Sequence, residues 1–191
     1  MSSNKPLSFK IYDKDVWVDI ASNIHHTYNA AKGCWEDSSI GCDIHIYSES
    51  YIGNKWECNE TFVEEVEEDY IHFEVPYQEA FFTGRNYLLF GIIAGVRARE
   101  YQMLEPKGMP DNVSEDIKRC YKAWETDAHT PSYLDLKELE QLDDDMNLPV
   151  FLSSMEDEEY VIHTAKIIKN WILELKKFEG EDHRVVFWFD N

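Results

Sequence analysis

The chain has 191 residues, of which 43% are hydrophobic and 14% aromatic, so it can bury a core and does not read as a disordered chain. Its 38 acidic residues outnumber the 18 basic ones, and the net charge of −20 argues against direct nucleic-acid binding. No apolar run is long enough to span a bilayer and no signal-peptide pattern opens the chain, so we expect a cytoplasmic protein without membrane contacts.

The first part of the chain, residues 1–40, has mixed polarity and no pattern of catalytic residues. Two short runs, 8–12 and 16–20, have the composition of strands. Two adjacent histidines, His25 and His26, are placed in a loop or a short helix. We expect all 191 residues to form a single domain in which this segment is an N-terminal extension.

A β-hairpin is predicted next. Side chains alternate in polarity from 42 to 51, which is typical of a strand, and Gly53 and Asn54 then supply a turn. Residues 55–63 can return as the second strand. The segment that follows, up to Gly84, is interpreted as an excursion from the body of the domain.

The acidic residues are concentrated in three blocks, 64–69, 143–145 and 156–159. Blocks of this size are usually solvated faces or loops. The alternative is that the carboxylates imitate a ladder of phosphates, which would make the protein a DNA mimic that inhibits a host DNA-binding enzyme.

Two helices are predicted in the middle of the chain. Residues 86–97 are almost wholly apolar as far as Val96, which indicates a buried helix. A second helix covers 113–124 and begins with a capping box formed by Asn112 and Glu115. Its buried stripe follows spacings of four, three and four residues and consists of Val113, Ile117, Cys120 and Trp124.

The last third of the chain adds a short helix over roughly 134–142 and a long helix over 154–177, which starts with a capping box of Ser153 and Glu156. Residues 184–189 form a strand whose continuous apolarity predicts a central place in the sheet.

The expected fold is therefore a single α+β domain. Its sheet is mostly antiparallel, with the hairpin 42–63 beside the C-terminal strand 184–189. Helices near 86–97, 113–124 and 154–177 pack against it.

The Cys-x-x-His spacing of Cys42 and His45 suggests half of a zinc site. Side chains of a strand alternate between faces, however, so these two point to opposite sides. No second pair of Cys or His completes a set of four ligands, and we expect no structural zinc. The four cysteines, irregularly spaced, are expected to be reduced thiols, with Cys42 in the core.

Two Asp-x-His pairs are more informative, Asp43 with His45 and Asp127 with His129. A carboxylate can orient a histidine ring, which can then act as a base, an acid or a ligand. Each pair alone is also compatible with a buried, hydrogen-bonded histidine or a helix-capping aspartate. Together they could hold a ligand directly, and a weakly bound divalent ion at the four side chains is left open, with no other cofactor expected.

Basic residues form an island. Four of the five arginines lie within 85–122, where seven basic residues stand against five acidic ones. Such an island can bind an anion, although it can equally neutralise the surrounding acidic surface. We expect Arg85 to share one pocket with the two Asp-x-His pairs. The full candidate ligand-binding set is Asp43, His45, Arg85, Arg97, Asp127, His129 and Ser132.

Five ordered motifs and a tryptophan resemble a family of small hypothetical proteins encoded by phages and prophages. The motifs are a Gly-Cys-Asp-Ile-His strand, an Arg-x-Tyr-x-Leu-Phe-Gly-x-x-Ala-Gly-Val-Arg helix, a Gly-x-Pro-Asp loop, an Asp-x-His-x-x-Ser-Tyr-Leu loop and a C-terminal Phe-Trp-Phe-Asp-Asn. They lie here at 41–45, 85–97, 108–111, 127–134 and 187–191, with the tryptophan at Trp124. The chain departs from the family in the forty residues before the usual start and in Asn86, where an aspartate is expected, which puts a catalytic role at that position in doubt.

The resemblance implies a viral accessory protein in the infected host cell and implies no reaction. Because many host defences signal with nucleotides, we expect a counter-defence protein that binds and sequesters a small phosphorylated or nucleotide-type ligand, such as a cyclic nucleotide, with a homo-oligomer as a further possibility. The alternative is a metal-assisted hydrolase of such a nucleotide, with His45 or His129 as general base or metal ligand. The sequence shows no recognisable nucleophile arrangement, so catalytic residues are not assigned.

Overall fold

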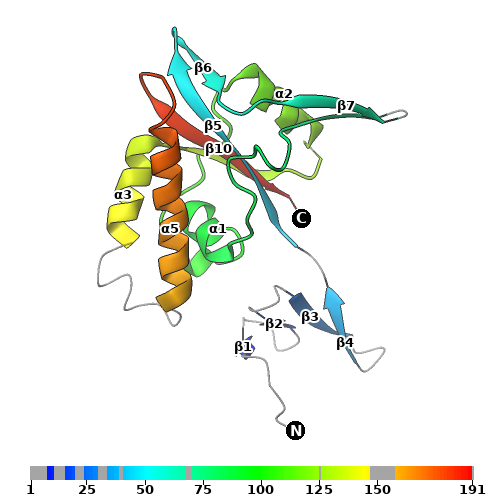
Figure 1. Cartoon of the computed structure of the whole chain (residues 1–191). Helices are drawn as coiled ribbons and strands as arrows, with labels where there is room; N and C mark the ends of the chain where they lie inside the picture. The colour runs from blue at the N-terminus through cyan, green and yellow to red at the C-terminus, as the bar shows by residue number, and fades with distance from the viewer. Residues whose placement is uncertain are drawn as a thin grey trace. The chain divides into compact units, whose positions relative to one another are not determined.

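The computed structural model of the chain describes residues 8–10, 16–19, 24–29, 34–38, 41–67, 70–124, 126–146 and 158–190 (Figure 1). Contacts within the chain divide it into two compact units, Met1–Asp43 with Asn191 and Ile44–Asp190. Antiparallel strands packed by helices confirm the predicted α+β class. That the whole chain folds as one domain stays a prediction. Among the described residues, no helix is both long and apolar enough to cross a membrane.

The first unit contains a four-stranded antiparallel sheet in which each strand pairs with the next. Its strands are β1 (Ser8–Lys10), β2 (Val16–Asp19), β3 (Ile24–Asn29) and β4 (Cys34–Ser38). The two predicted strand runs are thus confirmed. The loop or helix expected at His25 and His26 is wrong, because both residues lie in β3, paired with β2 on one side and β4 on the other. Pairing with neighbouring strands, rather than local composition, determines the secondary structure of this segment.

The second unit is built on a four-stranded sheet in the order β6-β5-β10-β9. Its strands are β5 (Asp43–Ile52), β6 (Lys55–Cys58), β9 (His129–Asp135) and β10 (His183–Asp190). The antiparallel pairing of β5 with β6 confirms the hairpin, and β10 is central as predicted. The five consecutive residues from Val185 to Phe189 are fully buried, because side chains on both faces of β10 are covered.

Helices cover this sheet on both faces. On one side lie α1 (Tyr87–Ala94), α3 (Leu136–Met146) and α5 (Glu158–Leu175), and on the other lies α2 (Glu115–Ala123) (Figure 1). Two neighbours in β10 show the division. Phe189 packs against Phe90 of α1 with ring centroids 5.1 Å apart, and Trp188 packs against Tyr121 of α2 at 5.2 Å. Successive side chains of a strand point to opposite faces, so the two rings enter different halves of the core.

The buried helix α1 is three residues shorter at its C-terminal end than predicted. Asn86 caps its first turn by accepting a hydrogen bond from a backbone N–H at 2.9 Å. Gly95 has a left-handed backbone with φ of 67°, which ends the helix at Ala94. A Cβ at Gly91 would collide with the backbone of Ala98, so only glycine allows the returning chain to approach this closely. A single 3-10 turn, η1 (Arg99–Tyr101), follows.

The start of α2 differs from the prediction. Ser114 is the N-cap residue and its side chain makes no capping hydrogen bond, so the capping box of Asn112 and Glu115 is wrong. Asn112 instead accepts a hydrogen bond from Arg184, and the backbone N–H of Ser114 donates to Glu49. Tertiary partners therefore take over the capping role.

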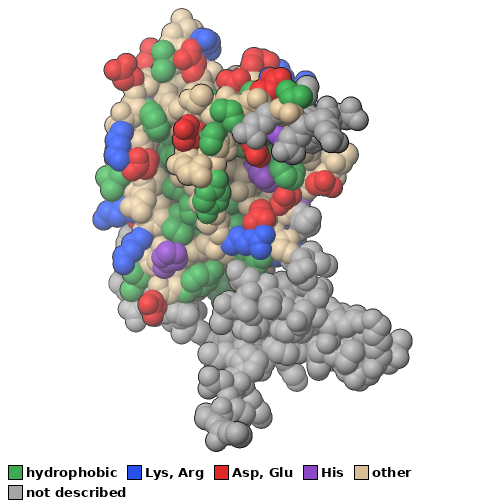
Figure 2. Space-filling view, turned by 45° about the vertical axis from the view of Figure 1, so that its right-hand side comes forward, with side chains coloured by type: hydrophobic (Ala, Val, Ile, Leu, Met, Phe, Trp, Pro, Cys, Tyr) green, Lys and Arg blue, Asp and Glu red, His purple; other side chains and the backbone are tan. Residues whose placement is uncertain are grey.

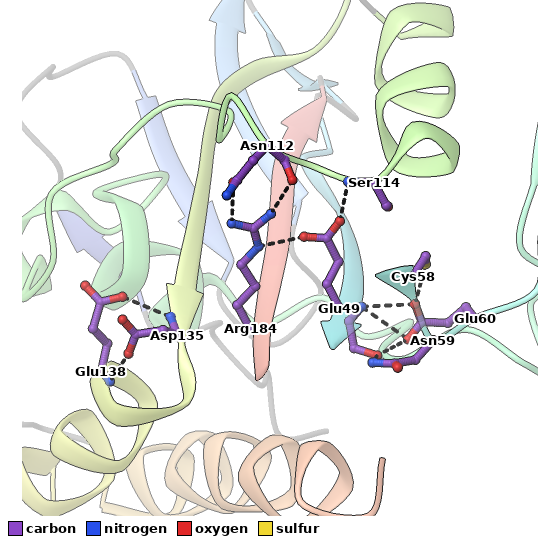
Figure 3. Close-up of polar contacts among 10 residues, drawn as sticks. Glu49, Cys58, Asn59, Glu60, Asn112, Ser114, Asp135, Glu138 and Arg184 are labelled. Atoms are coloured by element: carbon purple, nitrogen blue, oxygen red, sulfur yellow. Dashed lines mark hydrogen bonds and ion pairs between the residues drawn. The ribbon is translucent and has the colours of Figure 1, made fainter. Parts of the chain in front are cut away.

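The short helix predicted over roughly 134–142 is confirmed as α3, which begins at Leu136, but the loop predicted before it is wrong. Residues 129–135 form the strand β9, and α3 begins one residue later. Pro131 can lie inside a strand here because β9 is at the edge of the sheet. The backbone N–H of Asp135 donates to the carboxylate of Glu138, and the backbone N–H of Glu138 donates to the carboxylate of Asp135, both at 2.9 Å (Figure 3). The two residues thus form a reciprocal cap at the start of α3.

The long helix α5 is confirmed, with Val161, Ile168, Trp171 and Leu175 buried on one stripe. Ile162, next to Val161 in the chain, lies off that stripe and is 43% exposed. The capping box of Ser153 and Glu156 lies outside the described residues.

A two-stranded ribbon carries the first acidic block. Its strands, β7 (Val63–Glu67) and β8 (Tyr70–Glu74), are antiparallel and extend from the sheet beside α2 (Figure 1). Arg119 of α2 holds its base, with one nitrogen 2.8 Å from Glu64 and the guanidinium 3.9 Å above the Phe73 ring. On the face in Figure 2, Asp and Glu side chains form several separate groups interspersed with hydrophobic and basic ones.

A fully buried ion pair joins β5, β10 and the start of α2 (Figure 3). The Nε of Arg184 donates to one carboxylate oxygen of Glu49 at 2.6 Å, and the other oxygen accepts from the Ser114 N–H, also at 2.6 Å. Arg184 donates further to the side chain and carbonyl of Asn112 and stacks 3.9 Å from the Trp56 ring. These hydrogen bonds offset the cost of removing both charges from water.

Removing one partner of this pair should be strongly destabilising, because the other charge stays buried. We expect Glu49→Gln or Arg184→Met to lower the free energy of unfolding by about 3–5 kcal/mol. The double variant Glu49→Gln/Arg184→Met should lose less than the sum of the two single losses. Chemical denaturation of the four proteins measures this, and additive losses would contradict it. Glu57→Gln, in the exposed pair with Lys55, is the control and should change stability by about 1 kcal/mol or less.

Candidate functional site

His45 is held by a carboxylate that the sequence analysis did not assign to it. Its Nε2 lies 3.3 Å from an Oδ of Asp190, at the end of β10, and the two side chains are 19% and 18% exposed. The imidazole ring stacks on Trp188 with centroids 5.4 Å apart, and Trp124 at the end of α2 lies 4.3 Å away. His45 is thus an oriented, partly exposed histidine between two indole rings, a geometry that suits proton transfer as well as packing.

His129 lies on the opposite face of the sheet. It is the first residue of β9, it pairs with Phe189, and its ring stacks on Phe189 at 5.9 Å. His45 stacks on Trp188, the preceding residue of β10, which points the other way. The structure therefore does not bring His45 and His129 into one pocket. His129 keeps its Nδ1 3.0 Å from Thr130 Oγ1, while its buried Nε2 has no hydrogen-bond partner among the described residues.

The other predicted site residues lie in several different elements. Asp43 is the half-buried first residue of β5, and Asp127 is exposed in the turn after α2, where its backbone N–H donates to Trp124. Arg97 lies 5.9 Å above the Tyr87 ring. Ser132 is fully buried, and its hydroxyl accepts a hydrogen bond from the backbone of Lys107. A ligand-binding role for each of these residues stays a prediction.

Arg85 lines a hollow of about 410 Å³. The irregular segment that precedes α1 forms one wall, and α5 supplies the other through His163 and Ile167. Arg85 and His163 are both exposed. The remaining lining residues are Ala80, Phe81, Phe82, Thr83, Gly84 and Asn86. A cationic guanidinium and an imidazole beside two phenyl rings could bind an anion that also has an apolar part.

A buried polar network occupies the β5–β6 end of the sheet (Figure 3). Glu60 accepts hydrogen bonds from the hydroxyl of Ser48 at 2.6 Å, from its N–H, and from the thiol of Cys58 at 3.1 Å. Asn59 links Ser48 to Ser50, whose hydroxyl lies 3.0 Å from His183 Nδ1. Burial raises the pKa of Glu60, although its hydrogen bonds from Ser48 and Cys58 act in the opposite direction.

The buried thiols are poor nucleophiles. Burial raises the pKa of Cys58 well above its usual range and that of Cys120 to about 11, so both are protonated near neutral pH. The Sγ of Cys120 lies 3.3 Å from the hydroxyl of Tyr47, whose pKa is also raised by burial. Cys58 and Cys120 are free thiols, and Cys42 is buried as expected. Within the described part of the chain, no three His, Cys, Asp or Glu side chains are grouped to hold a metal ion.

Comparison of the chain with family models, with curated proteins and with solved structures found no match. The site is therefore assigned from its own geometry.

Three groups that matter to the site were missed in the sequence. Asp190 is the first carboxylate after the apolar run of β10. It is two residues from Trp188, and residues two apart in a strand lie on the same face. His163 precedes Ile167 and Trp171 at spacings of four, which places the three along one side of α5. Phe81 and Phe82 lie in a segment without regular structure, and no periodic pattern could have assigned them to the wall of the hollow.

His45 should contribute to stability through its two indole contacts. We expect His45→Ala to lower the free energy of unfolding by about 1–3 kcal/mol. His163→Ala, at an exposed position, should change it by about 0.5 kcal/mol or less. Thermal and denaturant unfolding of both variants measures the difference, and equal effects would mean that the stacked geometry adds no stability.

Glu60 should make stability dependent on pH. The pKa of Glu60 is higher in the folded chain than in the unfolded chain. Its contribution to the free energy of unfolding is therefore fully present below the unfolded pKa of about 4.3 and is lost as pH rises through the folded pKa. The stability of the Glu60→Gln variant relative to the parent protein should therefore increase as pH rises from about 4 to 8.

Denaturant unfolding across this pH range measures the effect of Glu60→Gln. Glu57→Gln removes a carboxylate from the same hairpin and serves as the control. A stability difference between Glu60→Gln and the parent that is constant with pH would show that the Glu60 carboxyl titrates alike in both states.

Proposed function

We propose that the protein binds and sequesters a small phosphorylated ligand in the hollow beside Arg85. The observation that carries this proposal is the convergence of Arg85 and His163, from two separate elements, on a hollow of about 410 Å³. This volume falls within the range of small-molecule sites. Phosphate oxygens accept charge-assisted hydrogen bonds from a guanidinium, which suits Arg85 to an anionic group.

Sequestration is favoured over hydrolysis by the chemistry of the lining. Among its residues, Thr83 is the one with a hydroxyl, and none is a cysteine or a carboxylate. The His45–Asp190 pair, which has the geometry of an oriented base, is not among the residues that line the hollow. A ligand held at Arg85 would therefore be retained unchanged. The resemblance to phage-encoded proteins supports a role in counter-defence, with a signalling compound of the infected cell as the ligand.

Loss of the guanidinium should weaken ligand binding. The purified protein is incubated with a panel of linear and cyclic nucleotides, and affinities are measured by calorimetry. We expect Arg85→Ala to lower the affinity for the bound compound by about tenfold or more, since a hydrogen bond to a charged group contributes about 1.5–3 kcal/mol. Arg99→Ala removes the same charge from an exposed position outside the hollow and should retain the parent affinity.

The fate of the ligand separates the rival functions. After heat denaturation, release of intact compound in at most one equivalent per chain supports sequestration. Cleaved product beyond one equivalent would establish the hydrolase. Inhibition of a host DNA-binding enzyme that persists in Arg85→Ala, with no compound bound, would establish the DNA mimic.

A further inference from the structure

The hollow beside Arg85 has an aromatic wall that is not part of the sealed core. Phe81 and Phe82 are half-buried, whereas the core phenylalanines Phe90, Phe187 and Phe189 are fully buried. Both half-buried residues line the hollow. Their rings rest on Trp171 of α5, with centroid distances of 6.0 Å for Phe81 and 5.4 Å for Phe82. The buried indole therefore supports the wall from behind.

Gly84 sets the position of the Phe82 ring. A Cβ added at Gly84 would lie 2.7 Å from the ring carbon Cζ of Phe82, closer than carbon atoms pack, and 3.1 Å from a Cε, so the ring would have to shift. The ring thus occupies the space that any other residue at 84 would fill. Glycine at this position keeps Phe82 against the same short segment that carries Arg85.

The wall and the cation differ in what they can bind. A phosphate group beside Arg85 and His163 would leave the two half-buried phenyl rings uncovered. A planar aromatic group attached to that phosphate would cover the rings, since stacking of a base on an aromatic side chain is favourable for every base. We infer that the ligand carries a nucleobase that stacks on Phe82, so that the bound compound is a nucleotide and not a sugar phosphate. This inference rests on the proposed function and names the class of ligand.

Two phosphate monoesters that differ in the base test the inference, adenosine 5′-monophosphate and ribose 5-phosphate. The parent protein should bind the nucleotide about tenfold more tightly or better. In Phe82→Leu the two affinities should differ by no more than about a factor of two or three, chiefly because nucleotide binding is weakened. Leucine keeps the apolar surface but lacks the aromatic face. Phe73→Leu replaces a half-buried phenylalanine that does not line the hollow, and should keep the parent preference.

Gly84→Ala provides a second test if Phe82→Leu does not fold. The added methyl group displaces the ring while every polar lining residue stays unchanged, so the preference for the nucleotide should fall here also. Equal affinity of the parent protein for both probes would overturn the inference and leave phosphate binding intact. A preference that persists in the folded variants would overturn it too. Failure of both probes to bind at millimolar concentration would overturn the proposed function together with the inference.

Discussion

The buried pair of Glu49 and Arg184 is the constraint around which the larger unit is arranged. It joins neighbouring strands and, through Asn112 and Ser114, fixes the start of α2 against the sheet. Two charges without exposure to water persist only when their hydrogen-bonding groups are satisfied. The backbone N–H of Ser114 donates to Glu49, and the side-chain oxygen and backbone carbonyl of Asn112 accept hydrogen bonds from Arg184. The turn before α2 is therefore shaped by the ion pair and not by capping of its own helix.

The central strand β10 runs from this pair to the other end of the sheet. There it separates His45 and His129, which occur in the same Asp-x-His pattern in the sequence. Its alternation sends Trp188 toward His45 and Phe189 toward His129. His45 and His129 thus pack against different halves of the core. His45 takes its carboxylate partner from the far end of the chain, at Asp190, and not from a neighbour in its own strand. Packing against indole rings gives this histidine a structural role whatever chemistry it supports.

The ligand site proposed beside Arg85 is lined by none of the residues of the two Asp-x-His pairs. The hollow forms where an irregular segment crosses α5, and such segments can present backbone and side chains that regular elements hold inside. Its aromatic wall rests on Trp171, and the Phe82 ring occupies the space that a side chain at Gly84 would fill. The buried thiols and Glu60 lie in other parts of the fold and belong to its packing.

The sequence by itself determined the α+β class, the hairpin of β5 and β6, the central place of β10 and the helices α1, α2 and α5. These depend on periodicity and on continuous apolar runs, which are local properties. Only the tertiary structure decided that Pro131 lies in an edge strand, that Asn112 serves Arg184, and that Asp190 orients His45. The hollow beside Arg85 was equally invisible in the sequence. Each of these features joins residues far apart in the chain, and local pattern carries no information on which distant group satisfies a buried charge or fills a neighbouring space.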